Sequence, residues 1–132
     1  MSVLFIEYPK CSTCQKAKKW LEDHQVAYTD RHIVEDNPTL SELTEWHARS
    51  RLDIKKFFNT SGIKYRELDL SNKLRTMSLE EQLSLLATDG MLVKRPLIIV
   101  DDFILIGFKE AEWEKKLLGC ELYVSRNNLK SS

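Results

Sequence analysis

The chain of 132 residues has the size of one ordinary domain, and its 20 Lys and Arg residues balance 20 Asp and Glu residues. Without an overall basic field, direct binding to nucleic acid or to an anionic membrane is disfavoured. No apolar run approaches the roughly 20 residues that span a bilayer, and the start of the chain lacks a signal-peptide pattern, so we expect a cytoplasmic protein. We predict one domain over residues 1–120 and a polar C-terminal tail over residues 121–132.

The first predicted elements are a strand and a helix. Val3 to Ile6 is short, β-branched and aromatic, which favours a buried strand. Between Gln15 and His24 apolar residues recur at three- and four-residue spacing, with lysines and acids on the other face, which predicts an amphipathic helix. Val26 to Tyr28 is a candidate second strand, with an extension to Ile33 left open, and would complete a parallel β-α-β unit.

The middle of the chain predicts helices. Thr39 to Glu42 reads as a capping box that opens a helix ending near Ser50, and a second capping box opens at Ser78. A short helix is expected between them, followed by a turn of small and polar residues; Ile63 to Arg75 gives no clear assignment. The predicted ranges are Leu52 to Phe58 for the short helix, Asn59 to Gly62 for the turn and Leu79 to Ala87 for the helix that the second capping box opens.

Two further strands are predicted, Pro96 to Val100 and Phe103 to Gly107, joined by a two-residue hairpin turn. An amphipathic helix from Lys109 to Leu118 follows. The order is therefore β-α-β, an inserted helical segment, then β-β-α. This is the thioredoxin-like arrangement of an α/β protein with a mixed sheet.

Cys11 and Cys14 form a Cys-x-x-Cys motif in the turn between the first strand and the first helix. Backbone N–H groups at a helix start favour a thiolate, so Cys11 is the candidate nucleophile. Cys14 lies about one helical turn on and is the candidate resolving cysteine, whereas Cys120 reads as a packing or half-exposed cysteine. We expect no metal site, because a structural zinc would need two further ligands and no second cysteine pair exists.

Four motifs occur in order within Val3 to Leu118: Tyr8-Pro9-Lys10-Cys11-Ser12-Thr13-Cys14-Gln15-Lys16-Ala17, Phe57-Phe58-Asn59-Thr60-Ser61-Gly62, Asp89-Gly90-Met91-Leu92-Val93-Lys94-Arg95-Pro96 and Gly107-Phe108. Together they make the chain similar to the arsenate reductase-like family, which also holds the Spx-type regulators. What this family shares is its fold more than its activity.

The resemblance implies roles for further residues. It implies a cis Pro96 that faces the reactive cysteine, with Arg95 beside it as a cation for a thiolate or an oxyanion. Lys10, Ser12 and Thr13 surround Cys11 and, with the free N–H groups of the helix start, would form an anion cradle.

The arsenate-reducing members of the family hold their oxyanion with three arginines, and the resemblance gives only Arg95 a counterpart here. The first position falls in Asn59-Thr60, which leaves Asn59 as a candidate substrate contact, and the third falls between Ile106 and Phe108. Each lost charge-assisted pair removes about 1.5–3 kcal/mol, so efficient arsenate reduction is not expected.

Three hypotheses follow. The first is a thiol-disulfide oxidoreductase that needs no cofactor, acts on a small oxyanion or disulfide and is recycled by a cellular thiol. The second is a redox-switched regulator of the Spx type, which would bind RNA polymerase rather than DNA. The third is a binding module of the same fold with idle thiols.

Overall fold

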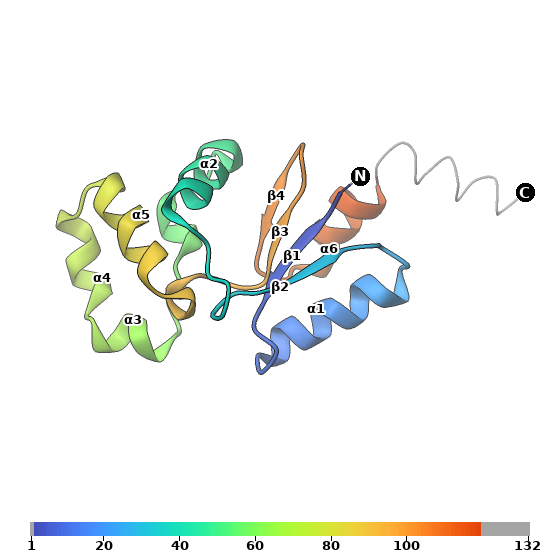
Figure 1. The fold of residues 1–132 in the computed structure, drawn as a ribbon, viewed down its shortest axis with the longest axis horizontal. Coiled ribbons are helices and arrows are strands. Elements are labelled where there is room, and N and C mark those ends of the chain that lie inside the picture. The colour runs from blue at the N-terminus through green and yellow to red at the C-terminus, as the bar shows by residue number, and fades with distance from the viewer. Residues whose placement is uncertain (1, 120–132) are drawn as a thin grey trace, which may run out of the picture.

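The computed structural model describes residues 2–119, in which four strands form one mixed sheet (Figure 1). In the spatial order β2-β1-β3-β4, β1 and β2 run parallel, whereas β3 runs antiparallel to both β1 and β4. The predicted α/β, thioredoxin-like fold is confirmed. Cys120 and the predicted tail, residues 121–132, lie outside the described residues. The strands are β1 (Leu4–Glu7), β2 (Thr29–His32), β3 (Leu97–Ile99) and β4 (Ile104–Ile106).

Successive residues of β1 point to opposite faces of the sheet, so each face presents apolar side chains that helices cover. Phe5 packs in an apolar cluster with α1 (Ser12–Asp23) and α6 (Glu110–Trp113), whereas Ile6 packs against the inserted helical segment. Figure 1 shows α1 and α6 on one side of the sheet and α2 to α5 on the other. The predicted closing helix is present, but after α6 it continues as a π-helical turn, Glu114–Leu118.

The inserted segment consists of short helices between β2 and β3. Both predicted capping boxes are present: Thr39 and Glu42 exchange side-chain and backbone hydrogen bonds at the start of α2, as do Ser78 and Glu81 at the start of α5. No helix within residues 2–119 is long and apolar enough to cross a membrane. The segment contains α2 (Leu40–Ser50), a 3₁₀ turn (Ile54–Phe57), α3 (Ile63–Glu67), α4 (Leu70–Lys73), a 3₁₀ turn (Leu74–Thr76), α5 (Leu79–Thr88) and a 3₁₀ turn (Gly90–Leu92).

The second strand does not lie at Val26 to Tyr28, where it was predicted, but at Thr29–His32. The Val26 N–H donates to the Leu21 carbonyl at 2.9 Å, so this stretch still closes the end of α1. Pairing with β1 begins only when the Thr29 N–H donates to the Val3 carbonyl at 2.9 Å. The ladder reaches Ile33, whose N–H donates to Glu7, as the longer alternative had allowed.

The short helix predicted over Leu52 to Phe58 is only the 3₁₀ turn Ile54–Phe57. The chain leaves this turn because Phe58 forms a bridge with Val93, and the Asn59 N–H donates to the Leu92 carbonyl at 2.8 Å. This pairing places the Asn59 to Gly62 turn next to the chain that leads into Pro96. Residues far apart in the sequence therefore meet beside the cysteine motif.

Candidate active site

Cys11 is the N-cap residue of α1 and has extended backbone angles. A tight turn sets this position, since the Cys11 N–H donates to the Tyr8 carbonyl at 2.9 Å. The Cys11 carbonyl accepts the first helical hydrogen bond, from the Gln15 N–H at 3.0 Å. The sulfur lies at the positive end of a twelve-residue helix, where the first backbone N–H groups have no helical acceptor.

The two sulfurs of the motif lie in different surroundings. Cys11 is half-buried and Cys14 is completely buried, and both are free thiols. Burial raises the pKa of Cys11, but hydrogen bonds from the Cys14 N–H and thiol, from the Arg95 guanidinium and from the Thr13 N–H outweigh it and lower this pKa below its ordinary value. Burial raises the pKa of Cys14 to about 12, with a smaller contribution from the nearby negative charges of Cys11 and Glu7.

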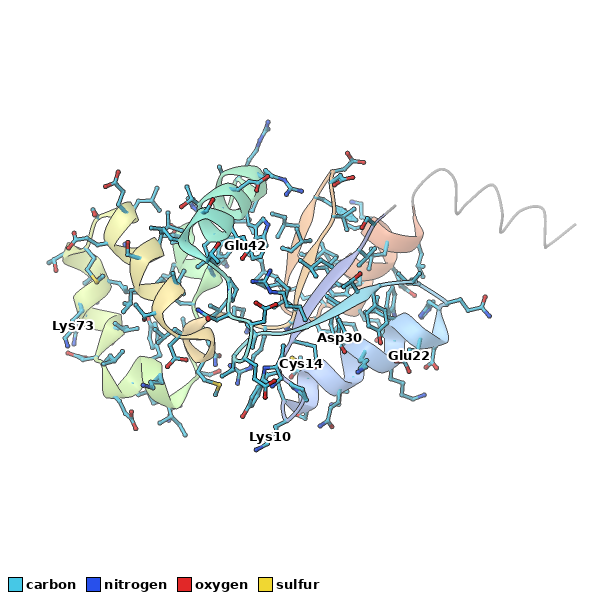
Figure 2. The ribbon with its side chains drawn as sticks, viewed as in Figure 1. Lys10, Cys14, Glu22, Asp30, Glu42 and Lys73 are labelled. Carbon is cyan, nitrogen blue, oxygen red and sulfur yellow. The ribbon has the colours of Figure 1, made fainter. Side chains whose placement is uncertain are left out.

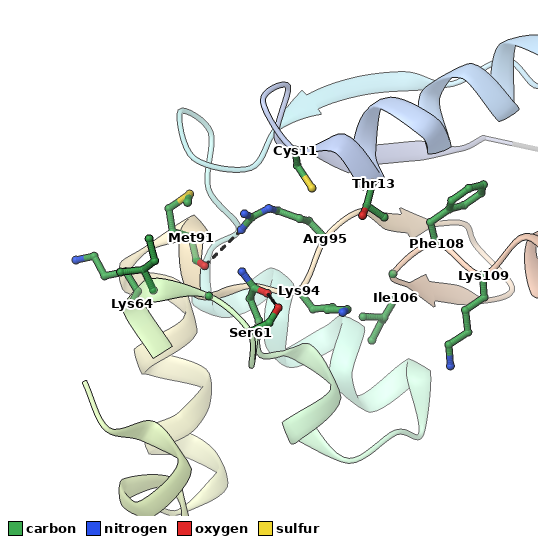
Figure 3. Close-up of a pocket in the computed structure, with 14 residues that line it drawn as sticks. Cys11, Thr13, Ser61, Lys64, Met91, Lys94, Arg95, Ile106, Phe108 and Lys109 are labelled. Carbon is green, nitrogen blue, oxygen red and sulfur yellow. Dashed lines mark hydrogen bonds between the residues drawn. The ribbon is translucent and has the colours of Figure 1, made fainter. Parts of the chain in front are cut away.

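Arg95 lies beside Cys11 in Figure 3, and its guanidinium carbon is 5.1 Å from the centre of the Tyr8 ring. Its Nη1 donates a long hydrogen bond of 3.5 Å to the Met91 carbonyl. The Arg95–Pro96 peptide bond is cis, as the resemblance implied. Pro96 itself is buried, and its carbonyl accepts from the Gly107 N–H at 2.8 Å.

A cavity of about 460 Å³ opens in front of Cys11 (Figure 3). The described residues that line it include four cations and no carboxylate. One of the cations, Lys64, pairs with Asp89 at 3.5 Å, just outside the cavity. The lining residues are Cys11, Thr13, Asn59, Ser61, Gly62, Ile63, Lys64, Met91, Lys94, Arg95, Ile106, Gly107, Phe108 and Lys109.

The predicted site residues divide into two groups. Thr13, Asn59 and Arg95 line the cavity together with Cys11, whereas Cys14 and Pro96 are buried behind it. Lys10 and Ser12 are exposed and are not among the lining residues, and Figure 2 shows Lys10 pointing away from the body of the protein. Lys10 and Ser12 therefore do not line this cavity, and their role in an anion cradle stays a prediction.

Sequence reasoning missed several residues at the site. Lys94 adjoins Arg95, and that adjacency was the only signal for it. Lys64 and Lys109 carry no sequence signal, because only the folded chain brings α3 and the start of α6 to the cavity beside Cys11. Glu7 was also missed, although a single acid that ends an apolar strand run is unusual. It is 4% exposed and is the buried charged residue of the described chain.

Comparison with known proteins gives a consistent result. Residues 6–116 match the ArsC family. The chain is 55% identical over 115 residues to the uncharacterized protein YusI of Bacillus subtilis, covering 87% of this chain and 98% of that protein. It is 27% identical to the global transcriptional regulator Spx of Staphylococcus epidermidis, covering 79% of this chain and 78% of that regulator. The crystal structure of an ArsC family related protein from Bacteroides fragilis is 61% identical, with coverage of 87% and 97% and a TM-score of 0.84.

Proposed function

The chain belongs to the ArsC family, and from that premise we propose that it is a thiol-disulfide oxidoreductase in which Cys11 attacks and Cys14 resolves. The observation that carries the proposal is the contrast between two sulfurs one helical turn apart. The half-buried Cys11 opens onto a cavity and has a lowered pKa, whereas the buried Cys14 has a raised pKa. Cys11 is therefore suited to attack a substrate that enters from solvent, and Cys14 is suited to attack the Cys11 sulfur from the protein interior.

The proposed reaction has two displacement steps. The Cys11 thiolate attacks one sulfur of a disulfide R–S–S–R, so that a Cys11–S–R bond forms and R–S⁻ leaves. Cys14 then attacks the Cys11 sulfur, the Cys11–Cys14 bond forms, and the second R–S⁻ leaves. The substrate gains two electrons and the two cysteines lose two. A cellular thiol reduces the protein disulfide again, and no cofactor takes part.

Arg95 has a supporting role in this proposal. Its guanidinium would stabilise the Cys11 thiolate before attack and the departing R–S⁻ after it, together with the N–H groups at the start of α1. An oxyanion could use the same groups, with Thr13 and Asn59 as further donors. Because lysines rather than arginines complete the cavity, the bidentate clamps that suit arsenate are few. We therefore rank a disulfide above arsenate as the substrate.

The experiment that tests the proposal equilibrates the Cys11–Cys14 pair in glutathione redox buffers and follows turnover of a small disulfide, with arsenate assayed in parallel. Mass spectrometry after mild peroxide treatment should find Cys11 linked to Cys14. The Cys14→Ser variant should stop at a mixed disulfide on Cys11. If it turned over as fast as the parent, the resolving role would be wrong.

A second candidate function is favoured by the similarity to Spx, which covers 79% of this chain. In this alternative the same disulfide would switch the binding of RNA polymerase. Co-purification of RNA polymerase with the oxidised chain, and its loss in the Cys14→Ser variant, would support the regulator. Turnover of a disulfide without polymerase binding would support the enzyme. In either case we propose a cytoplasmic protein with one domain over residues 1–120.

A further inference from the structure

The second displacement step needs a base, because Cys14 has to lose a proton before it can attack Cys11. In the dithiol form the pKa of Cys14 is raised to about 12, mainly by burial, and burial still opposes ionisation of the thiol once Cys11 is bound in the mixed disulfide. The side chain is completely buried, so water does not reach the sulfur. A group inside the protein must therefore take the proton if the disulfide is to close quickly.

Glu7 lies where such a group is needed. It ends β1 and shares the sheet face of Phe5, since residues two apart in a strand point to the same side. Phe5 packs in the cluster that includes Ala17 and Leu21 of α1, so this face of β1 lies beneath that helix. Cys14 is in the first turn of α1, and the negative charge of Glu7 contributes to its raised pKa, which places the two side chains within electrostatic reach of each other.

Glu7 is also connected to solvent. Its carboxyl group shares a hydrogen bond with the carboxyl group of Asp30 on β2. Asp30 in turn accepts a hydrogen bond of 3.0 Å from the Nζ of Lys18 on α1. The Asp30 and Lys18 side chains are 38% and 43% exposed. Through Asp30, the buried carboxyl group of Glu7 is therefore connected to a partly exposed ion pair at the protein surface.

We propose that Glu7 accepts the proton of the Cys14 thiol as Cys14 closes the disulfide, and that Asp30 passes this proton to solvent. The inference rests on the proposed function. The Cys14 S–H bond breaks and a Glu7 O–H bond forms, while the Cys14 sulfur bonds to the Cys11 sulfur. The electron pair of the Cys11–S–R bond leaves on R–S⁻. Glu7 is not used up, because its proton moves to Asp30 and then to water.

The protonation of Glu7 suits this role near neutral pH. Burial, the hydrogen bond that protonated Glu7 donates to Asp30 and the negative charge of Asp30 raise the pKa of Glu7 to about 7, and the Lys18 cation opposes them. The groups that face Glu7 are thus Asp30 from β2 and Lys18 and Cys14 from α1, and His32 is its register partner on β2. The His32 ring is engaged elsewhere, accepting from the N–H groups of Val34 and Glu35 at 3.1 Å.

The test follows the two displacement steps separately in the full chain, with Cys120→Ser as background so that only the motif reacts. Dithiobis(nitrobenzoic acid), an aromatic disulfide, releases one coloured thiolate when Cys11 attacks and a second when Cys14 resolves. In the Glu7→Gln variant the first release should keep its rate. The second should slow by at least about ten-fold at pH 7, since general base catalysis contributes about 10²–10⁴-fold.

The pH profile of the second release separates proton transfer from a structural effect of the substitution. The parent should show an inflection near pH 7 that the Glu7→Gln variant lacks and a Glu7→Asp variant restores in part. Two surface variants, at the ion pair that contacts Glu7, test the same inflection. Asp30→Asn should move it to lower pH, because Asp30 raises the Glu7 pKa, and Lys18→Met should move it to higher pH.

The outcomes distinguish this inference from the proposed function. If both releases occur but Glu7→Gln changes neither the rate nor the profile of the second, the proton-accepting role is wrong and the oxidoreductase stands. An inflection that both surface variants leave in place would also overturn the role. If the parent shows no first release, or no second one, the proposed function itself is wrong and the inference falls with it.

Discussion

The guanidinium carbon of Arg95 lies 5.1 Å from the centre of the Tyr8 ring, so an aromatic face holds this cation beside the reactive sulfur. The contact links the strand-to-helix turn to the loop that precedes Pro96. Arg95 thereby reaches Cys11 from a distant part of the sequence, and its hydrogen bond helps to lower the pKa of that thiol.

We expect Arg95→Met to raise the pKa of Cys11 and to slow its alkylation by iodoacetamide several-fold at pH 7, because a donor to the thiolate is lost. The pH dependence of the alkylation rate measures this pKa directly. Lys94→Met is the matched control, since Lys94 lines the same cavity but does not hydrogen-bond to Cys11. Equal pKa values for the two variants would contradict the role of Arg95.

Glu7→Gln should stabilise the protein at and above neutral pH. The folded-state pKa of Glu7, about 7, lies above the ordinary value of 4.5, so the folded protein holds this proton more tightly than the unfolded chain. Stability due to the protonated carboxyl group is complete below pH 4.5 and is lost as the pH rises to about 7. The variant avoids that loss, and the difference should reach about 2–3 kcal/mol above pH 7. Urea unfolding at a series of pH values checks it, and a difference independent of pH would contradict it.

Glu42→Gln should destabilise the protein at pH 7 by about 1–3 kcal/mol. Both carboxylate oxygens of Glu42 accept hydrogen bonds from Arg31, at 2.7 and 2.8 Å, and this lowers the Glu42 pKa to about 2. The lowered pKa means that the stabilisation is complete above about pH 4.5 and disappears as the pH falls towards 2. Urea unfolding of parent and variant should converge in that acid range.

The other capping box provides the control for this prediction. Glu81 occupies the same position in the second box, accepting from the Ser78 N–H at 2.9 Å, but no arginine contacts it in the described chain. Glutamine keeps the capping hydrogen bond in both boxes. Glu81→Gln should therefore change stability much less than Glu42→Gln, and equal effects would show that the Arg31 pair is unimportant.

Gly90→Ala should destabilise the fold by about 3 kcal/mol, near the upper end of overpacking costs. A Cβ atom at Gly90 would lie 1.9 Å from the Ile33 carbonyl oxygen, which is backbone and cannot turn aside. Gly62→Ala is a milder comparison, because the closest atom there is the Asn59 side-chain nitrogen at 2.7 Å, which can rotate. Thermal or urea unfolding of both variants distinguishes them, and equal losses would contradict the backbone argument.

Local signals in the sequence predicted local structure well. The two capping boxes and the cysteine at a helix start were correct because a few adjacent residues determine them. The second strand was predicted too early because Tyr28 has strand propensity. In the structure the Tyr28 ring packs edge-on against Phe5, with 5.4 Å between ring centres, in the stretch that connects α1 to β2. The site was predicted only where a motif marked it. Lys64 and Lys109 come to Cys11 through the packing of separate elements, which no local pattern encodes.

The pairing of residues 57–59 with residues 92–94 places the Asn59 to Gly62 turn beside the cavity. One part of the cavity lining comes from Cys11 and Thr13 at the start of α1 and from Arg95 just before β3, and another part, from Asn59 to Lys64, comes from the inserted segment. Under the proposed function, the residues that set the reactivity of Cys11 and the residues that would contact a partner thus come from separate parts of the chain. We therefore expect changes in the Asn59 to Gly62 turn to alter which substrate or partner is bound while leaving the cysteine chemistry in place.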